Sequence, residues 1–93
     1  MATDAPWNAV IEPDDVTSVG QELSCLSTAS PSINSAEWIE NGHVIAGESA
    51  LTLTAPDRWL DNGTFTLSCR VVNYLGSDLS PEISFILLSK FHI

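Results

Sequence analysis

The chain has 93 residues, of which 44% are hydrophobic, and a formal net charge of −9 from 3 basic and 12 acidic residues. A chain of this length corresponds to a single domain. So small a domain buries only roughly 60 to 65% of the surface that its unfolded chain exposes, so a cross-link is an expected source of stability. The negative charge disfavours nucleic acid as a partner, and the longest apolar run, residues 83–88, is too short to span a bilayer.

The first strand is predicted over residues 7–11, where Trp7, Ala9 and Ile11 alternate onto one face. A proline stands on either side, which suits an edge strand because proline cannot donate a backbone hydrogen bond. Residues 16–19 are expected to continue this strand beyond a kink. Trp7 could then anchor a partner from the edge of the sheet.

The middle of the chain predicts four short strands, at residues 22–27, 36–40, 43–45 and 50–54, with a Ser-rich loop at residues 28–34. Leu23 and Cys25 point to one face of the first of these strands, and Leu51 and Leu53 point inward from the last. Asn41-Gly42 predicts a two-residue hairpin turn between the second and the third.

The segment from Asp61 to Gly76 opens with an Asp-Asn-Gly turn, runs as an alternating strand and closes on an Asn-x-x-Gly turn. Its predicted inward face consists of Phe65, Leu67, Cys69 and Val71. Residues 82–88 predict a final strand that is apolar on both faces. No helix longer than a turn is predicted anywhere in the chain.

The landmarks of the chain occur in the order Cys25, Trp38, Asp61-x-Gly63, Cys69 and then Asn73 with Gly76. In this order the sequence resembles the immunoglobulin superfamily over nearly its full length, nearest the intermediate and constant-two sets. The resemblance implies an all-β fold, an immunoglobulin-like β-sandwich of two antiparallel sheets with seven to eight strands in a Greek key. Residues 1–93 are expected to form a single such domain, a fragment of a larger protein.

The residues alone leave three roles open for Cys25 and Cys69: a disulfide, a metal pair or two reduced core thiols. Metal is disfavoured because no Cys-x-x-Cys or histidine spacing supplies further ligands. The resemblance implies the disulfide, with Trp38 packed against it in the core, whereas reduced thiols would fit a cytoplasmic muscle-type relative. Trp59 is expected to close the bottom of the sandwich.

One family feature is missing from the sequence. Members of the family place a tyrosine two residues before the second cysteine, but Leu67 stands there, and the nearest aromatic residue is Phe65. We expect either that Phe65 packs beside Asp61-x-Gly63 in place of the tyrosine, or that the cysteine sits one residue pair deeper along its strand. The expected core signature is Trp38, Asp61, Gly63 and Phe65.

No catalytic residue, metal site or cofactor is predicted, and the chain is not expected to be an enzyme. His43 and His92 lie far apart without a partner motif, and both are expected at the surface. No Gly-x-Ser-x-Gly motif is present. Asp14-Asp15 with Glu12 lacks the alternating oxygen ligands of a calcium loop.

Asn62-Gly63-Thr64 is a glycosylation acceptor sequence on a predicted turn, which matters only if the protein is secreted. The Asn-Gly pair also serves the turn itself. Both interpretations of Asn62 therefore remain open at this stage.

A candidate partner face follows from the inward direction of Cys69. Arg70, Val72 and Tyr74 should then point outward, beside Ile39 of the neighbouring strand. Aliphatic residues together with arginine and tyrosine have the composition of an interface, whereas the opposite sheet is expected to expose mostly polar residues. Single exposed aliphatic residues are also common, and a neighbouring domain could cover these.

The resemblance therefore implies non-enzymatic protein–protein recognition, in adhesion or as a receptor, by an extracellular, cell-surface or secreted module. The partner would be another protein or a second copy of the chain, with no nucleic acid and no membrane insertion. The alternative is a structural spacer in a multi-domain filament or a cytoplasmic muscle-type protein.

Overall fold

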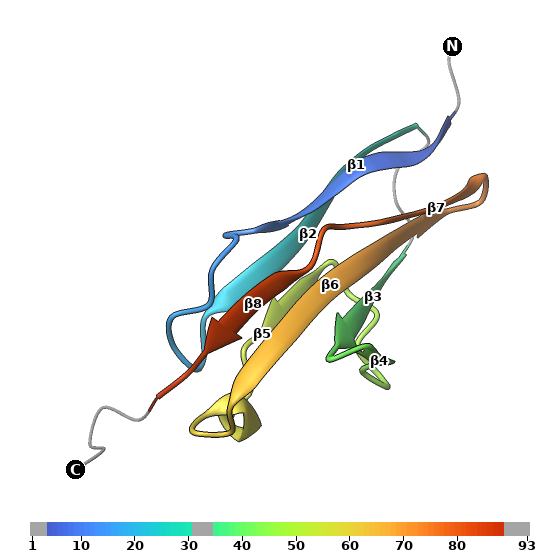
Figure 1. The fold of residues 1–93 in the computed structure, drawn as a ribbon. Coiled ribbons are helices and arrows are strands. Elements are labelled where there is room, and N and C mark those ends of the chain that lie inside the picture. Colours follow the sequence, from blue (N-terminus) through green and yellow to red (C-terminus); the bar gives the residue numbers. More distant parts are fainter. Residues whose placement is uncertain (1–3, 31–34, 89–93) are drawn as a thin grey trace.

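A computed structural model describes residues 4–30 and 35–88 of the chain, and its strands form two layers (Figure 1). The strands are β1 (Asp4–Glu12), β2 (Glu22–Ser30), β3 (Ser35–Glu40), β4 (His43–Val44), β5 (Thr52–Thr54), β6 (Thr64–Asn73), β7 (Gly76–Leu79) and β8 (Ile83–Ile86), and a 3-10 turn, η1 (Asp57–Trp59), precedes β6. One sheet has the order β1-β2-β5, and the other has the order β4-β3-β6-β7 with β8 also paired to β6. Every named strand pair is antiparallel, so the predicted all-β sandwich is confirmed.

The core lies between the two sheets and is built by the alternation of β2, β3 and β6. Its fully buried large side chains are Trp38, Trp59, Leu23, Leu67, Val71, Cys25 and Cys69. The predicted inward face of β6 is confirmed, because every second residue from Phe65 to Val71 is buried. This long strand belongs to the larger sheet and packs against β1 and β2 of the smaller one, which fixes the direction of its outward residues.

β7 and β8 are two halves of one edge strand, and both pair with β6. At the break, the backbone N–H of Cys69 donates to Ser80 Oγ at 2.9 Å, and the N–H of Ser80 donates to the Cys69 carbonyl at 2.8 Å. These bonds carry the ladder past Pro81, which has no N–H of its own. The sequence analysis did not predict β7, because Gly-Ser-Asp-Leu shows no apolar alternation.

Trp7 does not share the inward face of Ala9 and Ile11. Asn8 has a positive φ of 60°, and the pairing of β1 with β2 shifts register between Trp7 and Val10. This bulge turns Trp7 outward, so the indole is 55% exposed while Ala9 and Ile11 are buried. The predicted orientation of Trp7 is wrong because alternation holds only where no extra residue is inserted into the strand.

Two other strand predictions are also wrong. Residues 16–19 form no strand, and Val16 instead contributes a buried side chain to the core from a loop. β5 begins only at Thr52, so Leu53 is buried while Leu51 is 38% exposed. In addition, β2 continues to Ser30 past its predicted end, whereas the rest of the predicted loop and His92 lie outside the described residues.

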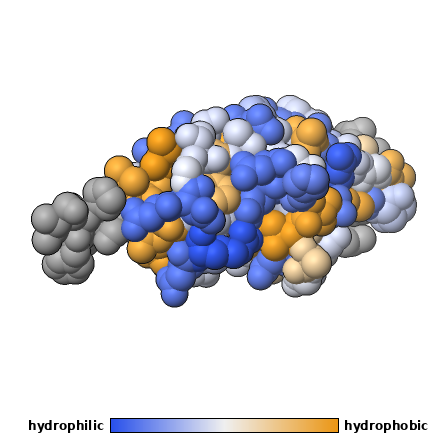
Figure 2. Space-filling view, turned by 60° about the horizontal axis from the view of Figure 1, so that its bottom comes forward, coloured by the Kyte–Doolittle hydropathy of each residue, from blue (hydrophilic) through white to orange (hydrophobic). Residues whose placement is uncertain are grey.

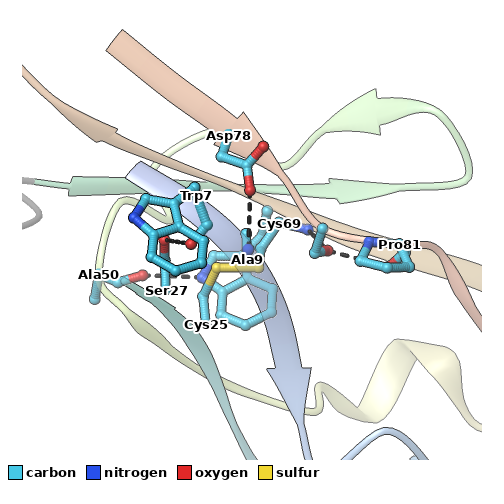
Figure 3. The surroundings of a disulfide bond; sticks show 10 residues. Trp7, Ala9, Cys25, Ser27, Ala50, Cys69, Asp78 and Pro81 are labelled. Carbon is cyan, nitrogen blue, oxygen red and sulfur yellow. Dashed lines mark hydrogen bonds between the residues drawn. A yellow bond between two sulfur atoms is a disulfide. The ribbon is translucent and has the colours of Figure 1, made fainter. Parts of the chain in front are cut away.

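Two turns depend on glycine. Asn41 and Gly42 both have positive φ, 49° and 83°, as a tight hairpin of the predicted kind requires. Gly76 has φ of 156°, and a Cβ added there would lie 3.0 Å from Cβ of Ala5, so only glycine lets β1 approach β7 so closely. Farther along the same contact, the N–H of Ala9 donates to Asp78 Oδ2 at 2.9 Å (Figure 3).

Candidate functional site

The centre of the molecule is the Cys25–Cys69 disulfide, which joins β2 to β6 across the two sheets with a Cα–Cα distance of 6.2 Å (Figure 3). Trp38 is the cross-strand partner of Cys69, and its Nε1–H donates to the Ala50 carbonyl at 2.9 Å. All three side chains are fully buried. The disulfide joins the two sheets through their inner faces, so any binding surface must lie elsewhere.

Three aromatic rings close the other end of the core. Trp59 lies 5.7 Å from Phe65 and 5.1 Å from Phe85 between ring centroids, and the two phenylalanines are 6.0 Å apart. Phe65 thus packs with aromatic residues in place of the missing tyrosine. Asp61 and Gly63 are exposed in the turn and are not part of the core, so this part of the expected core signature is wrong.

The indole of Trp59 is held by a carboxylate and a guanidinium. Its Nε1–H donates to Glu40 Oε1 at 2.9 Å, and the Arg58 guanidinium contacts both Glu40 oxygens at 2.6 and 2.7 Å. The hydrogen bond from Arg58 is the main cause that lowers the pKa of Glu40, against burial, which raises it. The paired carboxylate raises the pKa of Arg58 in turn. These interactions fix Trp59 at the base of the sandwich.

Glu40→Ala is expected to lower the free energy of unfolding by about 1–3 kcal/mol, because the buried Trp59 N–H loses its acceptor. Glu40→Gln keeps an acceptor and should lose less. Since the pKa of Glu40 is lowered in the folded state, the charged form stabilises the fold above its ordinary pKa of 4.5, and this stabilisation disappears as the pH falls through the folded pKa. Chemical denaturation at pH 7 and at pH 3 should show that the difference in the free energy of unfolding between wild type and Glu40→Gln becomes smaller in acid. A difference independent of pH would contradict a role for the charge.

The structure brings three of the four predicted partner-face residues onto one surface of the larger sheet. Ile39 and Val72 are half-buried there, and Arg70 lies between their rows with its Nε 3.5 Å from Glu37 Oε1. Both side chains of this ion pair are over 40% exposed, so the pair itself contributes little stability. Tyr74 lies at the tip of the β6–β7 hairpin and is 72% exposed.

Two exposed residues that sequence reasoning missed extend this surface to both edges of the sheet. Leu79 of β7 pairs with Arg70, and Val44 of β4 pairs with Ile39. They are 48% and 55% exposed. Leu79 could not be found in advance because β7 was not predicted as a strand. We call Ile39, Val44, Arg70, Val72, Tyr74 and Leu79 the partner face.

Exposed apolar residues also occur elsewhere on the molecule. Trp7 and Leu26 lie on the other sheet, and Leu60, Ile86 and Leu88 lie near the end of β8. On the side of the molecule in Figure 2, hydrophobic surface lies in separate areas with hydrophilic surface between them. The partner face is distinguished from these areas by its arginine and because its residues come from four neighbouring strands of one sheet and the hairpin that joins two of them.

The described part of the chain holds no arrangement that suggests metal chemistry. Within residues 4–30 and 35–88, no group of three or more His, Cys, Asp or Glu side chains could hold a metal ion. His43 is exposed and lines a shallow surface hollow with Glu40 and Arg58, whose charges are already paired. In the same residues, no helix is long and apolar enough to cross a membrane.

Comparison with known proteins supports the architecture. No protein-family model matches the sequence, and no curated protein matches it. Among solved structures, the chain is similar to the N-terminal four Ig domains of Dscam1 isoform 1.9, with 24% sequence identity and a TM-score of 0.59. The match covers 87% of this chain and 20% of the Dscam1 chain, so this protein spans about a fifth of the length of that structure. At this identity the likeness shows the fold, and the assignment to the intermediate or constant-two set stays a prediction.

Proposed function

Since the chain folds as an immunoglobulin-like domain, we propose that it is a non-enzymatic recognition module that binds another protein outside the cell or at its surface. The observation that carries the proposal is the partner face, where Leu79 and Val72 adjoin Arg70 and an exposed tyrosine stands at the tip of the adjacent hairpin. Tyrosine and arginine are enriched among the residues that contribute most to protein–protein binding. Aliphatic residues around them exclude water when a partner docks.

The geometry of the face suits a flat protein surface better than a small ligand. Its strands lie side by side, and Val44 and Leu79 stand at opposite edges with Arg70 and Ile39 between them. Arg70 lies near Glu37 in an exposed ion pair, and most of the hydrogen-bond donors of its guanidinium stay available. A partner carboxylate placed over Arg70 could accept from these donors.

The disulfide supports the extracellular location, because disulfides persist in secreted and cell-surface proteins and are rare in the cytoplasm. A spacer without a ligand of its own is the alternative. The two differ in what they require of the partner face, since a spacer has no use for a particular outward arginine or tyrosine.

Tyr74→Ala is expected to weaken partner binding by about thirtyfold, or about 2 kcal/mol, because an exposed tyrosine of a binding surface commonly anchors the partner. The same holds for Arg70→Ala. Because Tyr74 is 72% exposed, its removal should leave the free energy of unfolding nearly unchanged. The partner is sought by staining cells that each display one secreted or membrane protein with a tetramer of the domain, and self-association is measured by sedimentation.

Thr54→Ala is the matched control, because Thr54 is exposed on the opposite sheet. It should bind like wild type. A partner that is insensitive to Arg70→Ala and Tyr74→Ala but lost with Trp7→Ala would place recognition on the other sheet. Absence of both a displayed partner and self-association would favour the spacer.

A further inference from the structure

The turn that leads into β6 presents the acceptor sequence Asn62-Gly63-Thr64 to solvent. All three residues are exposed, and positive φ values at Asp61 (55°) and Gly63 (85°) reverse the chain around Asn62. In Figure 1 this turn lies at the opposite end of β6 from the β6–β7 hairpin. We propose that Asn62 carries an N-linked glycan, an inference that rests on the extracellular location in the proposed function.

The side-chain amide of Asn62 has room for the transfer. Asn62 Nδ2 donates to the Arg58 carbonyl at 3.1 Å, and a primary amide carries two N–H groups. Transfer from a lipid-linked oligosaccharide pyrophosphate forms a bond from Nδ2 to the sugar C1 and breaks the bond from C1 to the pyrophosphate oxygen. Nδ2 gives up one proton to the solvent, and the lipid pyrophosphate leaves with the electron pair of the broken bond. One N–H remains to hold the Arg58 carbonyl, so the turn can keep its hydrogen bond after modification.

The hydroxyl that the acceptor sequence requires is also accessible. Thr64 is the first residue of β6, is exposed, and pairs with Ile86 at the edge formed by β8. Asn41 makes a useful contrast within the same chain. It also precedes a glycine, but His43 stands where the hydroxyl is needed. In addition, the N–H of Thr66 donates to Asn41 Oδ1 at 2.8 Å.

The glycan would stand well away from Tyr74. β6 has 10 residues, and at a rise of roughly 3.3 Å each its two ends lie about 30 Å apart. Two exposed apolar residues adjoin the acceptor sequence: Ile86 pairs with Thr64, and Leu60 stands two residues before Asn62. A bulky, solubilising sugar there would screen that end of the sandwich and leave the hairpin end of the partner face open.

The test is secretion of the full chain, with an added leader peptide, from eukaryotic cells. Asn62 is the one asparagine in the sequence followed at the second position by serine or threonine, so any N-glycan must be attached there. Intact mass should show one glycan on the wild type, and an amidase that releases N-glycans should remove it and convert Asn62 to aspartate. Asn62→Gln and Thr64→Ala should abolish it, whereas Thr64→Ser should retain it.

Thr54→Ala again serves as the control, because it removes a threonine of another exposed strand without touching the acceptor sequence. Secreted wild type that carries its disulfide but no glycan would overturn the inference. So would a glycan that persists on Asn62→Gln.

Partner binding separates the two proposals. Asn62→Gln should change the Kd for the displayed partner by less than about twofold, well below the effect of losing an anchor residue. If the wild type carries the glycan and Asn62→Gln loses it, but Tyr74→Ala still binds the partner like wild type, the result would count against the partner face alone. An unglycosylated wild type that still binds through Tyr74 would count against the glycan alone.

Discussion

Removing the Cys25–Cys69 disulfide is expected to lower the free energy of unfolding by about 2–5 kcal/mol, as for other small domains. The bond closes a loop of 44 positions, and the chain-entropy estimate for such a loop is about 4 kcal/mol. Net stabilities of domains are only about 5–15 kcal/mol, so the reduced protein should retain little margin. Guanidinium denaturation with and without a reducing agent measures the loss.

The paired variant Cys25→Ala with Cys69→Ala is the control, because it should unfold at the same denaturant concentration with or without reductant. It leaves Trp38 facing the gap where the sulfur atoms stood, so its loss should equal or exceed that of reduction. Equal midpoints for wild type and for the paired variant in oxidising buffer would contradict a stabilising role for the disulfide.

Trp59→Ala is expected to lower the free energy of unfolding by about 3–5 kcal/mol, the usual range for removing a buried aromatic side chain. The indole is fully buried, packs on Phe65 and Phe85, and donates to Glu40. Its removal leaves a cavity at the base of the sandwich and frees the Glu40 carboxylate from one of its donors. Denaturant titration followed by circular dichroism reports the change without relying on tryptophan fluorescence.

Two variants show whether burial causes this loss. Trp59→Phe keeps an aromatic ring and should fall between wild type and Trp59→Ala. Trp7→Ala removes the same side chain from an exposed site and should change stability by no more than about 0.5 kcal/mol. Similar losses for Trp7→Ala and Trp59→Ala would contradict the assignment of Trp59 to the core and of Trp7 to the surface.

The two functional proposals use opposite ends of β6. Tyr74 stands at the hairpin that ends the strand, and Asn62 at the turn that begins it. Cys69, which the disulfide joins to β2, lies between them on the same strand. A sugar at one end and a binding surface at the other can therefore act without obstructing each other.

The sequence by itself determined the sandwich and its central residues. The order of Cys25, Trp38 and Cys69 predicted an immunoglobulin-like fold, and strict alternation in β6 predicted which of its side chains are buried. The first signal is the resemblance of nearly the whole chain to a known family. The second is local in origin, because a regular strand sends successive side chains to opposite faces whatever its neighbours are. The outward direction of Arg70 and Val72 follows from the same alternation.

Only the tertiary structure decided where that alternation fails. The bulge at Asn8 turns Trp7 outward, and β7 forms although its sequence has no apolar pattern, because β6 supplies its hydrogen-bond partners. The packing of Phe65 against Trp59 and Phe85 likewise joins residues from separate segments. Bulges, edge pairing and ring contacts depend on which segments are neighbours in space, and the residues of one strand alone do not determine those neighbours.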